Sequence, residues 1–110
     1  MVKSTVLVDN TRWTVARCES AMRDGFYGVD LTGDNGDRLR IIPQPDESAQ
    51  VVLFPREGGE PIKMEGCAKA RMPRSGMKVN GVPAMEGWTD LACEAKGRKI
   101  EGRVEFERCH

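Results

Sequence analysis

Four cysteines are the residues of this chain with the clearest chemical potential: Cys18, Cys67, Cys93 and Cys109. Cysteine thiolates bind zinc, act as nucleophiles or oxidise to disulfides, and their spacing helps to separate these roles. Zinc sites usually take two ligands from one Cys-x2–4-Cys turn, and no two of these cysteines are that close. A cysteine nucleophile usually needs a nearby histidine as its base, and the only histidine of this chain is the terminal His110. The spacing therefore favours two structural disulfides, with free buried cysteines and a metal site as alternatives.

A predicted C-terminal hairpin ranks the three pairings that four cysteines allow. Apolar residues alternate on both sides of Lys96-Gly97, so residues 88–95 should pair with residues 98–108. This register pairs Cys93 with Ile100, Leu91 with Gly102 and Thr89 with Val104. Cys109 then lies about 30 Å from Cys93, whereas a disulfide needs Cα atoms within about 7 Å. A Cys93–Cys109 bond is therefore the least favoured pairing.

Pairing residues 62–72 antiparallel to residues 88–95 sets Cys67 opposite Cys93 and Met72 opposite Trp88. We therefore predict the disulfides Cys67–Cys93 and Cys18–Cys109. In the loop-entropy description the longer closure contributes about 4–5 kcal/mol and the shorter about 3 kcal/mol.

The pattern along the rest of the chain is typical of an all-β protein. β-branched and aromatic residues recur between turn signals about every 8–12 residues. We expect one β domain over residues 1–110, a small antiparallel β-sandwich or barrel of about seven to nine short strands. Residues 12–20 read as a strand through Cys18, and the alternative is a short helical turn near residues 16–24 that stops at Gly25.

A second hairpin is predicted from alternation around Asp34-Asn35-Gly36. A three-residue loop with Gly36 in the left-handed conformation sets Leu31 opposite Leu39 and Val29 opposite Ile41. This register places all four apolar side chains on one face of the sheet.

Residues 66–85 carry the candidate partner-binding side chains, and no acidic residue occurs among them. We expect a loop over residues 73–86 that can hold its own hairpin at Asn80-Gly81. Basic residues and methionines together suit an adaptable contact with an anionic partner. The plainer interpretation is a solvated loop whose methionines fold back onto the core. The candidates are Lys69, Arg71, Met72, Arg74, Met77 and Lys78.

Other patterns give weaker candidates for chemistry. The run from Asp30 to Ile41 begins like an EF-hand calcium loop, with alternating Asp and Thr. The match fails because its sixth and twelfth positions hold Asn35 and Ile41 instead of the required glycine and glutamate. Glu101, Glu105 and Glu107 alternate with Arg103 on one strand face, which predicts a solvated mixed-charge surface rather than an acid–base pair. We predict no metal and no cofactor. The two tryptophans, Trp13 and Trp88, are expected in the core or at its rim.

The charge and hydropathy of the chain argue against nucleic acid as a partner and against a transmembrane segment. The chain has 17 basic and 17 acidic residues, so it lacks the excess positive charge typical of nucleic-acid binding. No apolar run approaches the roughly 18–20 residues that span a bilayer, so no transmembrane segment is predicted. Met1 leads directly into polar sequence, which is compatible with a cytosolic start or with removal of a signal or lipoprotein leader. The cysteines favour the second reading, with a lipid anchor upstream as a further option.

These observations predict an exported, non-catalytic binding or accessory domain that acts through protein–protein contacts. The expected location is the periplasm, the outer-membrane surface or the extracellular space, and the expected partner is another protein with an acidic surface. The alternatives are a structural envelope-associated module without a discrete ligand site, and an enzyme that uses carboxylates.

Overall fold

The protein consists of two antiparallel β-sheets, here called sheet A and sheet B. The computed structural model describes the backbone of residues 2–79 and 82–110, and the side chains of residues 2–73 and 84–110. Sheet A contains β1 (Val2–Ser4), β2 (Leu7–Val8), β3 (Thr11–Arg12), β9 (Ala68–Arg71), β10 (Arg74–Val79), β11 (Val82–Ala95) and β12 (Arg98–Cys109). Sheet B contains β4 (Val15–Ser20), β5 (Val29–Gly33), β6 (Arg38–Pro43), β7 (Ala49–Phe54) and β8 (Ile62–Met64). One short 3-10 helix, η1 (Ala21–Asp24), joins β4 to β5.

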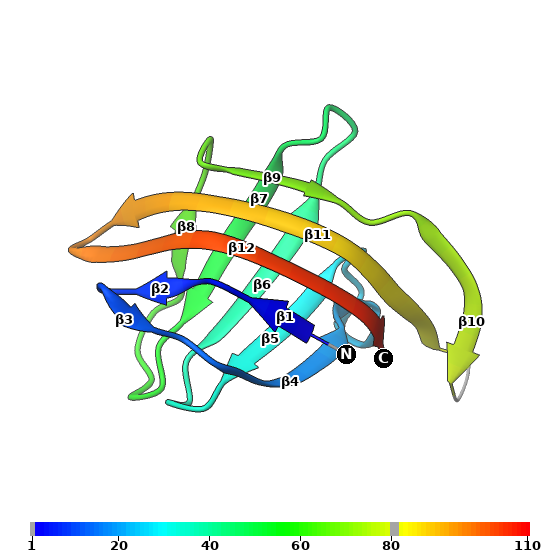
Figure 1. Cartoon of the computed structure of the whole chain (residues 1–110), viewed down its shortest axis with the longest axis horizontal. Helices are drawn as coiled ribbons and strands as arrows, with labels where there is room; N and C mark the ends of the chain where they lie inside the picture. Colours follow the sequence, from blue (N-terminus) through cyan, green and yellow to red (C-terminus); the bar gives the residue numbers. More distant parts are fainter. Residues whose placement is uncertain (1, 80–81) are drawn as a thin grey trace.

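The two sheets pack as layers of a sandwich. Sheet B follows the order β4-β5-β6-β7-β8, and the main path of sheet A follows β10-β11-β12-β2-β3. Strand β9 also pairs with β11, and β1 also pairs with β12. Figure 1 shows the long strands β11 and β12 lying in front of the strands of sheet B. The predicted all-β class and two disulfides are confirmed, and the sheets remain open rather than closing into a barrel.

The hairpin of β5 and β6 has the predicted register. Val29 pairs with Ile41 and Leu31 pairs with Leu39. Gly36 lies in the loop with φ of 92°, in the left-handed region that glycine adopts readily. All four apolar side chains are fully buried, so the alternation of the sequence was sufficient to place them.

The hairpin of β11 and β12 also has the predicted register. Cys93 pairs with Ile100, Leu91 with Gly102 and Thr89 with Val104. Further along, a register shift between Met85 and Gly87 brings Cys109 opposite Met85. Cys109 therefore lies at the far end of the hairpin from Cys93, as expected.

The single strand expected over residues 62–72 is wrong. Its first part is β8 in sheet B and its second part is β9 in sheet A, because the chain crosses between sheets at residues 65–67. Gly66, with φ of 71°, lies in this crossing. Arg71 rather than Met72 pairs with Trp88, so the predicted register was also displaced by one residue. Divisions of this kind raise the number of strands in the described residues to twelve, above the expected seven to nine.

The segment after Cys18 contains the helical turn that the sequence predicts as an alternative to the strand. Strand β4 continues to Ser20, whose hydroxyl accepts a hydrogen bond from the Met22 N–H at 3.2 Å and caps η1. Gly25 ends the turn in the left-handed conformation. The strand and the helical turn therefore follow one another.

The segment expected as a loop over residues 73–86 is mostly strand. β10 pairs with the beginning of β11, with Val79 opposite Val82 and Lys78 opposite Pro83. The predicted turn at Asn80-Gly81 lies outside the described residues.

Apolar side chains from both sheets fill the space between the layers. Trp13, which leads from β3 towards β4, is 2% exposed, and its indole Nε1–H donates to Asn35 Oδ1 at 3.0 Å. Its expected place in the core is confirmed. The largest fully buried side chains include Trp13, Leu31, Leu39, Ile41, Leu53, Met85 and Ile100.

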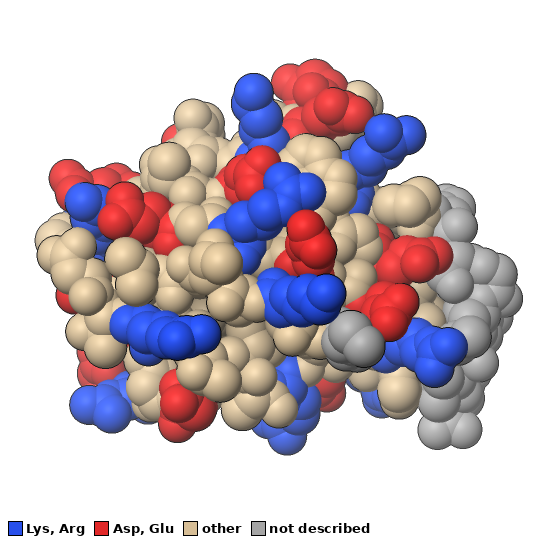
Figure 2. All heavy atoms as spheres, in the orientation of Figure 1, with Lys and Arg blue, Asp and Glu red and all other residues tan. Residues whose placement is uncertain are grey.

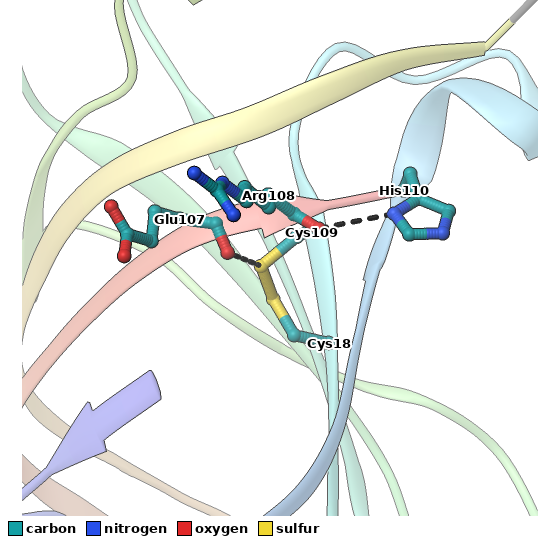
Figure 3. The surroundings of a disulfide bond; sticks show 5 residues. All are labelled: Cys18, Glu107, Arg108, Cys109 and His110. Carbon is teal, nitrogen blue, oxygen red and sulfur yellow. Dashed lines mark hydrogen bonds between the residues drawn. A yellow bond between two sulfur atoms is a disulfide. The ribbon is translucent and has the colours of Figure 1, made fainter. Parts of the chain in front are cut away.

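Both predicted disulfides are present. Cys18 on β4 is bonded to Cys109 on β12, which ties sheet B to the last strand of sheet A across 91 residues. Figure 3 shows this bond beside the chain end, where the Arg108 carbonyl oxygen lies 3.1 Å from His110 Nδ1. Cys67, just before β9, is bonded to Cys93 on β11. All four cysteines are therefore paired, which indicates an oxidising environment.

Candidate functional site

The structure places the predicted partner-binding residues in different surroundings. Lys69 and Arg71 are exposed on β9. Met72 is only 6% exposed and belongs to the core, so the expectation that it contributes to a contact surface is corrected. It is buried because it follows Ala68 and Ala70 on the inward side of the segment. The side chains of Arg74, Met77 and Lys78 lie outside the described residues.

Strand β9 presents its two cations because its alternate residues face the core. Ala68 and Ala70 are buried at 6% and 2% exposure, so the intervening Lys69 and the following Arg71 point away from sheet B. The other edge of β9 is held by the Ala70 N–H, which donates to the Glu47 carbonyl oxygen at 3.0 Å. Hydrogen bonds on both sides therefore fix the backbone that carries Lys69 and Arg71.

The register of sheet A aligns Arg71 with a tryptophan. Arg71 pairs with Trp88 on β11, Trp88 pairs with Glu105 on β12, and Glu105 pairs with Lys3 on β1. Cross-strand partners share a face of the sheet, so these four side chains form one row on the outer surface. A neighbouring row runs from Lys69 through Asp90 to Arg103.

Trp88 lies half-buried in the middle of these rows. The Arg103 guanidinium is stacked on the indole ring, 4.7 Å from its centroid. Arg103 is held there by Glu105 at 3.1 Å and by both carboxylate oxygens of Asp90 at 3.1 Å. The hydrogen bond to Glu105 is the main reason that the pKa of Arg103 is raised. The indole is therefore held in a fixed place by its neighbours.

We call this surface the Trp88 face. Trp88 was expected in the core or at its rim, and it lies half-buried on the outward side of β11 rather than in the core. The predicted register contained the signal needed to place it, because Thr89 was set facing inward opposite Val104 and its neighbour must face outward. The members of the Trp88 face are Lys3, Lys69, Arg71, Trp88, Asp90, Arg103 and Glu105.

The Trp88 face carries positive charge that the described part of the chain does not neutralise. Its two acids, Asp90 and Glu105, both bind Arg103. Lys3, Lys69 and Arg71 form no ion pair within the described residues. Figure 2 shows basic and acidic side chains interspersed over this side of the molecule. Three cations around Trp88 are thus available to an external anion.

Two shallow grooves flank the same face. One, of about 430 Å³, is bordered by Lys3, Trp88, Arg103 and Glu105. The other, of about 740 Å³, lies between β9 and the turn before β7. Its lining includes Lys69, Asp90, Asp46, Glu47 and Ser48. The hydroxyl and backbone N–H of Ser48 both bind Asp46 and lower the pKa of that carboxyl, so this turn is itself ordered.

The weaker candidates from the sequence lie elsewhere. Glu101 is 3.7 Å from Lys99, and Glu105 is paired with Arg103. Asp30, from the segment that resembles a calcium loop, binds Arg40 instead. Within the described residues no group of three or more His, Cys, Asp or Glu side chains is arranged to hold a metal ion.

Comparison of the chain with protein-family models, with curated proteins and with solved structures gives no match. Among the described residues, no helix has the length and apolar character needed to cross a membrane.

Proposed function

We propose that this protein is an exported, non-catalytic binding or accessory domain that acts through protein–protein contacts. The Trp88 face is its contact surface, and the partner presents acidic side chains there. The proposed location is the periplasm, the outer-membrane surface or the extracellular space. Support for export comes from the two disulfides, which persist in oxidising compartments.

One observation carries the choice of surface: a fixed tryptophan lies next to cations that have no partner in the described residues. Arg71 is the direct cross-strand neighbour of Trp88, and Lys69 is two residues from Arg71 on the same strand face. Tryptophan and arginine are enriched among the residues that dominate binding energy at protein interfaces. Because Arg103 and the sheet already hold the indole in place, little side-chain freedom is lost when a partner covers it.

Charge on the Trp88 face supports an acidic partner. Unpaired lysine and arginine side chains steer an anionic surface during association and disfavour basic competitors. Arg71 can form two parallel hydrogen bonds with a carboxylate, whereas Lys69 offers a compact charge. The shallow grooves beside Trp88 and Lys69 leave room for side chains of the partner.

Capture of partners from the periplasmic or extracellular fraction of the source cells tests this proposal. The bait is the oxidised domain, with the double variant K69E/R71E and the single variant W88A as tests. The matched control is R56E/K63E, which makes the same charge change at exposed residues of β8 and of the loop after β7, outside sheet A. We expect the wild type and the control to capture the same protein, and both test variants to lose it. Equal capture by all four baits would reject the Trp88 face as the contact surface.

The location is tested by intact mass after alkylation without reductant, on protein taken directly from cells. An exported protein should show two disulfides and no alkylated thiol. Four alkylated thiols would contradict export and point to a partner in a reducing compartment.

A further inference from the structure

The outer face of sheet B carries a second cluster of aromatic and basic side chains. Phe26, directly after η1 and Gly25, is 44% exposed and is the large apolar side chain most open to solvent among the described residues. Its ring lies against the Arg40 guanidinium, which is 4.8 Å from the ring centroid. The Phe26 ring is therefore accessible to a partner and is held in place by a cation–π contact.

A buried ion pair fixes the centre of this cluster. The Arg40 guanidinium binds Asp30 at 2.8 and 2.9 Å, and both side chains are 9% exposed. It also binds Asp24 at 2.6 Å and lies 5.5 Å from the centroid of Phe54. The hydrogen bond to Asp30 is the main reason that the pKa of Arg40 is raised. Because its guanidinium is held by Asp30 and Asp24, Arg40 in turn restrains the Phe26 ring that stacks on it.

Arg38 differs from Arg40 because it is positioned without a counter-ion. Its guanidinium lies 4.3 Å from the centroid of the Phe54 ring. Its cross-strand neighbours are Thr32 and Phe54, neither of which is charged. Within the described residues Arg38 takes part in no ion pair. Stacking restrains the flat guanidinium and leaves N–H donors that a carboxylate can bind.

We infer that Phe26, Arg38 and Phe54 form a second protein-binding surface, here called the Phe26 face. Its occupant is a segment of a partner protein that carries a carboxylate beside an apolar side chain. The carboxylate would bind Arg38, and the apolar side chain would cover the Phe26 ring. This inference stands apart from the proposed function, since the Phe26 face is on sheet B and shares no residue with the Trp88 face.

Charge distinguishes this occupant from a second copy of the chain. Two acids lie next to the Phe26 face, Asp24 and Asp30, and both are already bound to Arg40. In a symmetric dimer through this face, Arg38 of each copy would need an acid of the other copy, and the two acids nearest Phe26 are already engaged. A foreign acidic segment would satisfy Arg38 instead.

Selection of peptides from a displayed library of random dodecamers tests the inference. The oxidised domain is immobilised, and the enriched sequences are made as synthetic peptides for calorimetric titration. We expect peptides with Asp or Glu next to an aromatic or aliphatic residue. Arg38→Glu should weaken their binding by about tenfold or more, since it replaces attraction by repulsion. Arg38→Lys should lose less, because it keeps the charge and loses only the flat stacking geometry.

Control variants separate this test from the proposed function. The selection is also run with K69E/R71E as bait, and only peptides enriched on both baits are titrated, so that peptides bound through the Trp88 face are set aside. Phe26→Ser should weaken binding as well, and its thermal melting curve checks that η1 remains folded. The inference is overturned by absence of enrichment, by peptides that lack an acid, or by binding that Arg38→Glu leaves intact. A dimer in sedimentation equilibrium that Phe26→Ser dissociates would also overturn it, by assigning the face to a second copy.

Discussion

Arg98 and Asp37 join the two sheets through a hydrogen bond of 3.0 Å between the guanidinium and the carboxylate. Arg98 is the first residue of β12 in sheet A, and Asp37 directly precedes β6 in sheet B. The Asp37 side chain is 4% exposed and also accepts hydrogen bonds from the Arg56 N–H and from Asn35 Nδ2. Three loops therefore converge on one buried carboxylate at this end of the sandwich.

Replacement of Arg98 should destabilise the fold more than replacement of a surface arginine. Arg98→Ala removes one donor from Asp37 and leaves it two others, so we expect a loss of about 1–3 kcal/mol in the free energy of unfolding. Arg17→Ala is the matched control, because its ion pair with Glu19 is largely exposed and should be worth about 0–1 kcal/mol. Urea unfolding measures both variants. Equal losses would show that the contact between Arg98 and Asp37 adds no stability.

Arg98 also binds Asp9, and this contact should make the free energy of unfolding depend on pH in the acidic range. Burial raises the pKa of Asp9, but hydrogen bonds from the Lys99 N–H and from Arg98 outweigh it, so the pKa lies below its ordinary value. A carboxyl with a lowered pKa contributes stability that is present above its unfolded value, about 3.9, and lost as pH falls through its folded value. Asp9→Asn should therefore reduce the loss of stability between about pH 4 and pH 2. Unfolding free energies measured across that range would contradict this if the variant and the wild type fell in parallel.

The two disulfides should differ in their contribution. Cys18–Cys109 closes 91 residues and Cys67–Cys93 closes 26. Loop entropy predicts that removing the first with C18A/C109A costs about 4–5 kcal/mol, and that removing the second with C67A/C93A costs about 3–4 kcal/mol. Urea unfolding of the two double variants under oxidising conditions checks the order. A larger loss from C67A/C93A would mean that native contacts around that bond matter more than chain entropy.

Hairpins were predictable from the sequence because their register depends on local alternation and a turn. Leu31 and Leu39 flank Gly36 closely, and only one loop length sets them opposite each other. Thr89 and Val104 are likewise set opposite each other by the turn at Lys96-Gly97. In both cases the apolar positions and the turn residues agree on one register.

The crossing between sheets was not predictable from alternation. Ile62 and Met64 face the core from sheet B, whereas Ala68 and Ala70 face it from sheet A. All four occupy even positions, so the apolar pattern is the same as that of one continuous strand. The predicted disulfide between Cys67 and Cys93 is nevertheless correct. The Ala92 N–H, next to Cys93, donates to the Cys67 carbonyl oxygen, and the Cα atoms of the two cysteines lie 5.0 Å apart, close enough for the bond.

The surfaces proposed for binding depend on contacts between distant segments. Arg71 meets Trp88 only because β9 and β11 pair, and Arg38 meets Phe54 only because β6 and β7 pair. The sequence identified Lys69 and Arg71 from local charge. It gave no local signal that joins Phe26 to Arg40, since η1 brings that ring onto the outer face of sheet B.

The close approach of β9 to β11 predicts a strict requirement for glycine beside the tryptophan. Gly87 has φ of 145°, and a Cβ built there would overlap the Arg71 carbonyl oxygen. Gly87→Ala should therefore cost about 2–4 kcal/mol, from overpacking together with an unfavourable backbone conformation. It should also move Arg71 relative to Trp88 and change the near-ultraviolet circular dichroism of the indole.

Gly58→Ala is the control for backbone strain alone, since Gly58 has φ of 85° and a Cβ there meets no atom within 4 Å. Its cost should be about 1–2 kcal/mol, without a change in the tryptophan signal. Thermal and urea unfolding give the stabilities of both variants. If Gly87→Ala proved no more costly than Gly58→Ala, β9 would be free to move away from β11, and the fixed spacing of Arg71 and Trp88 would have to be abandoned.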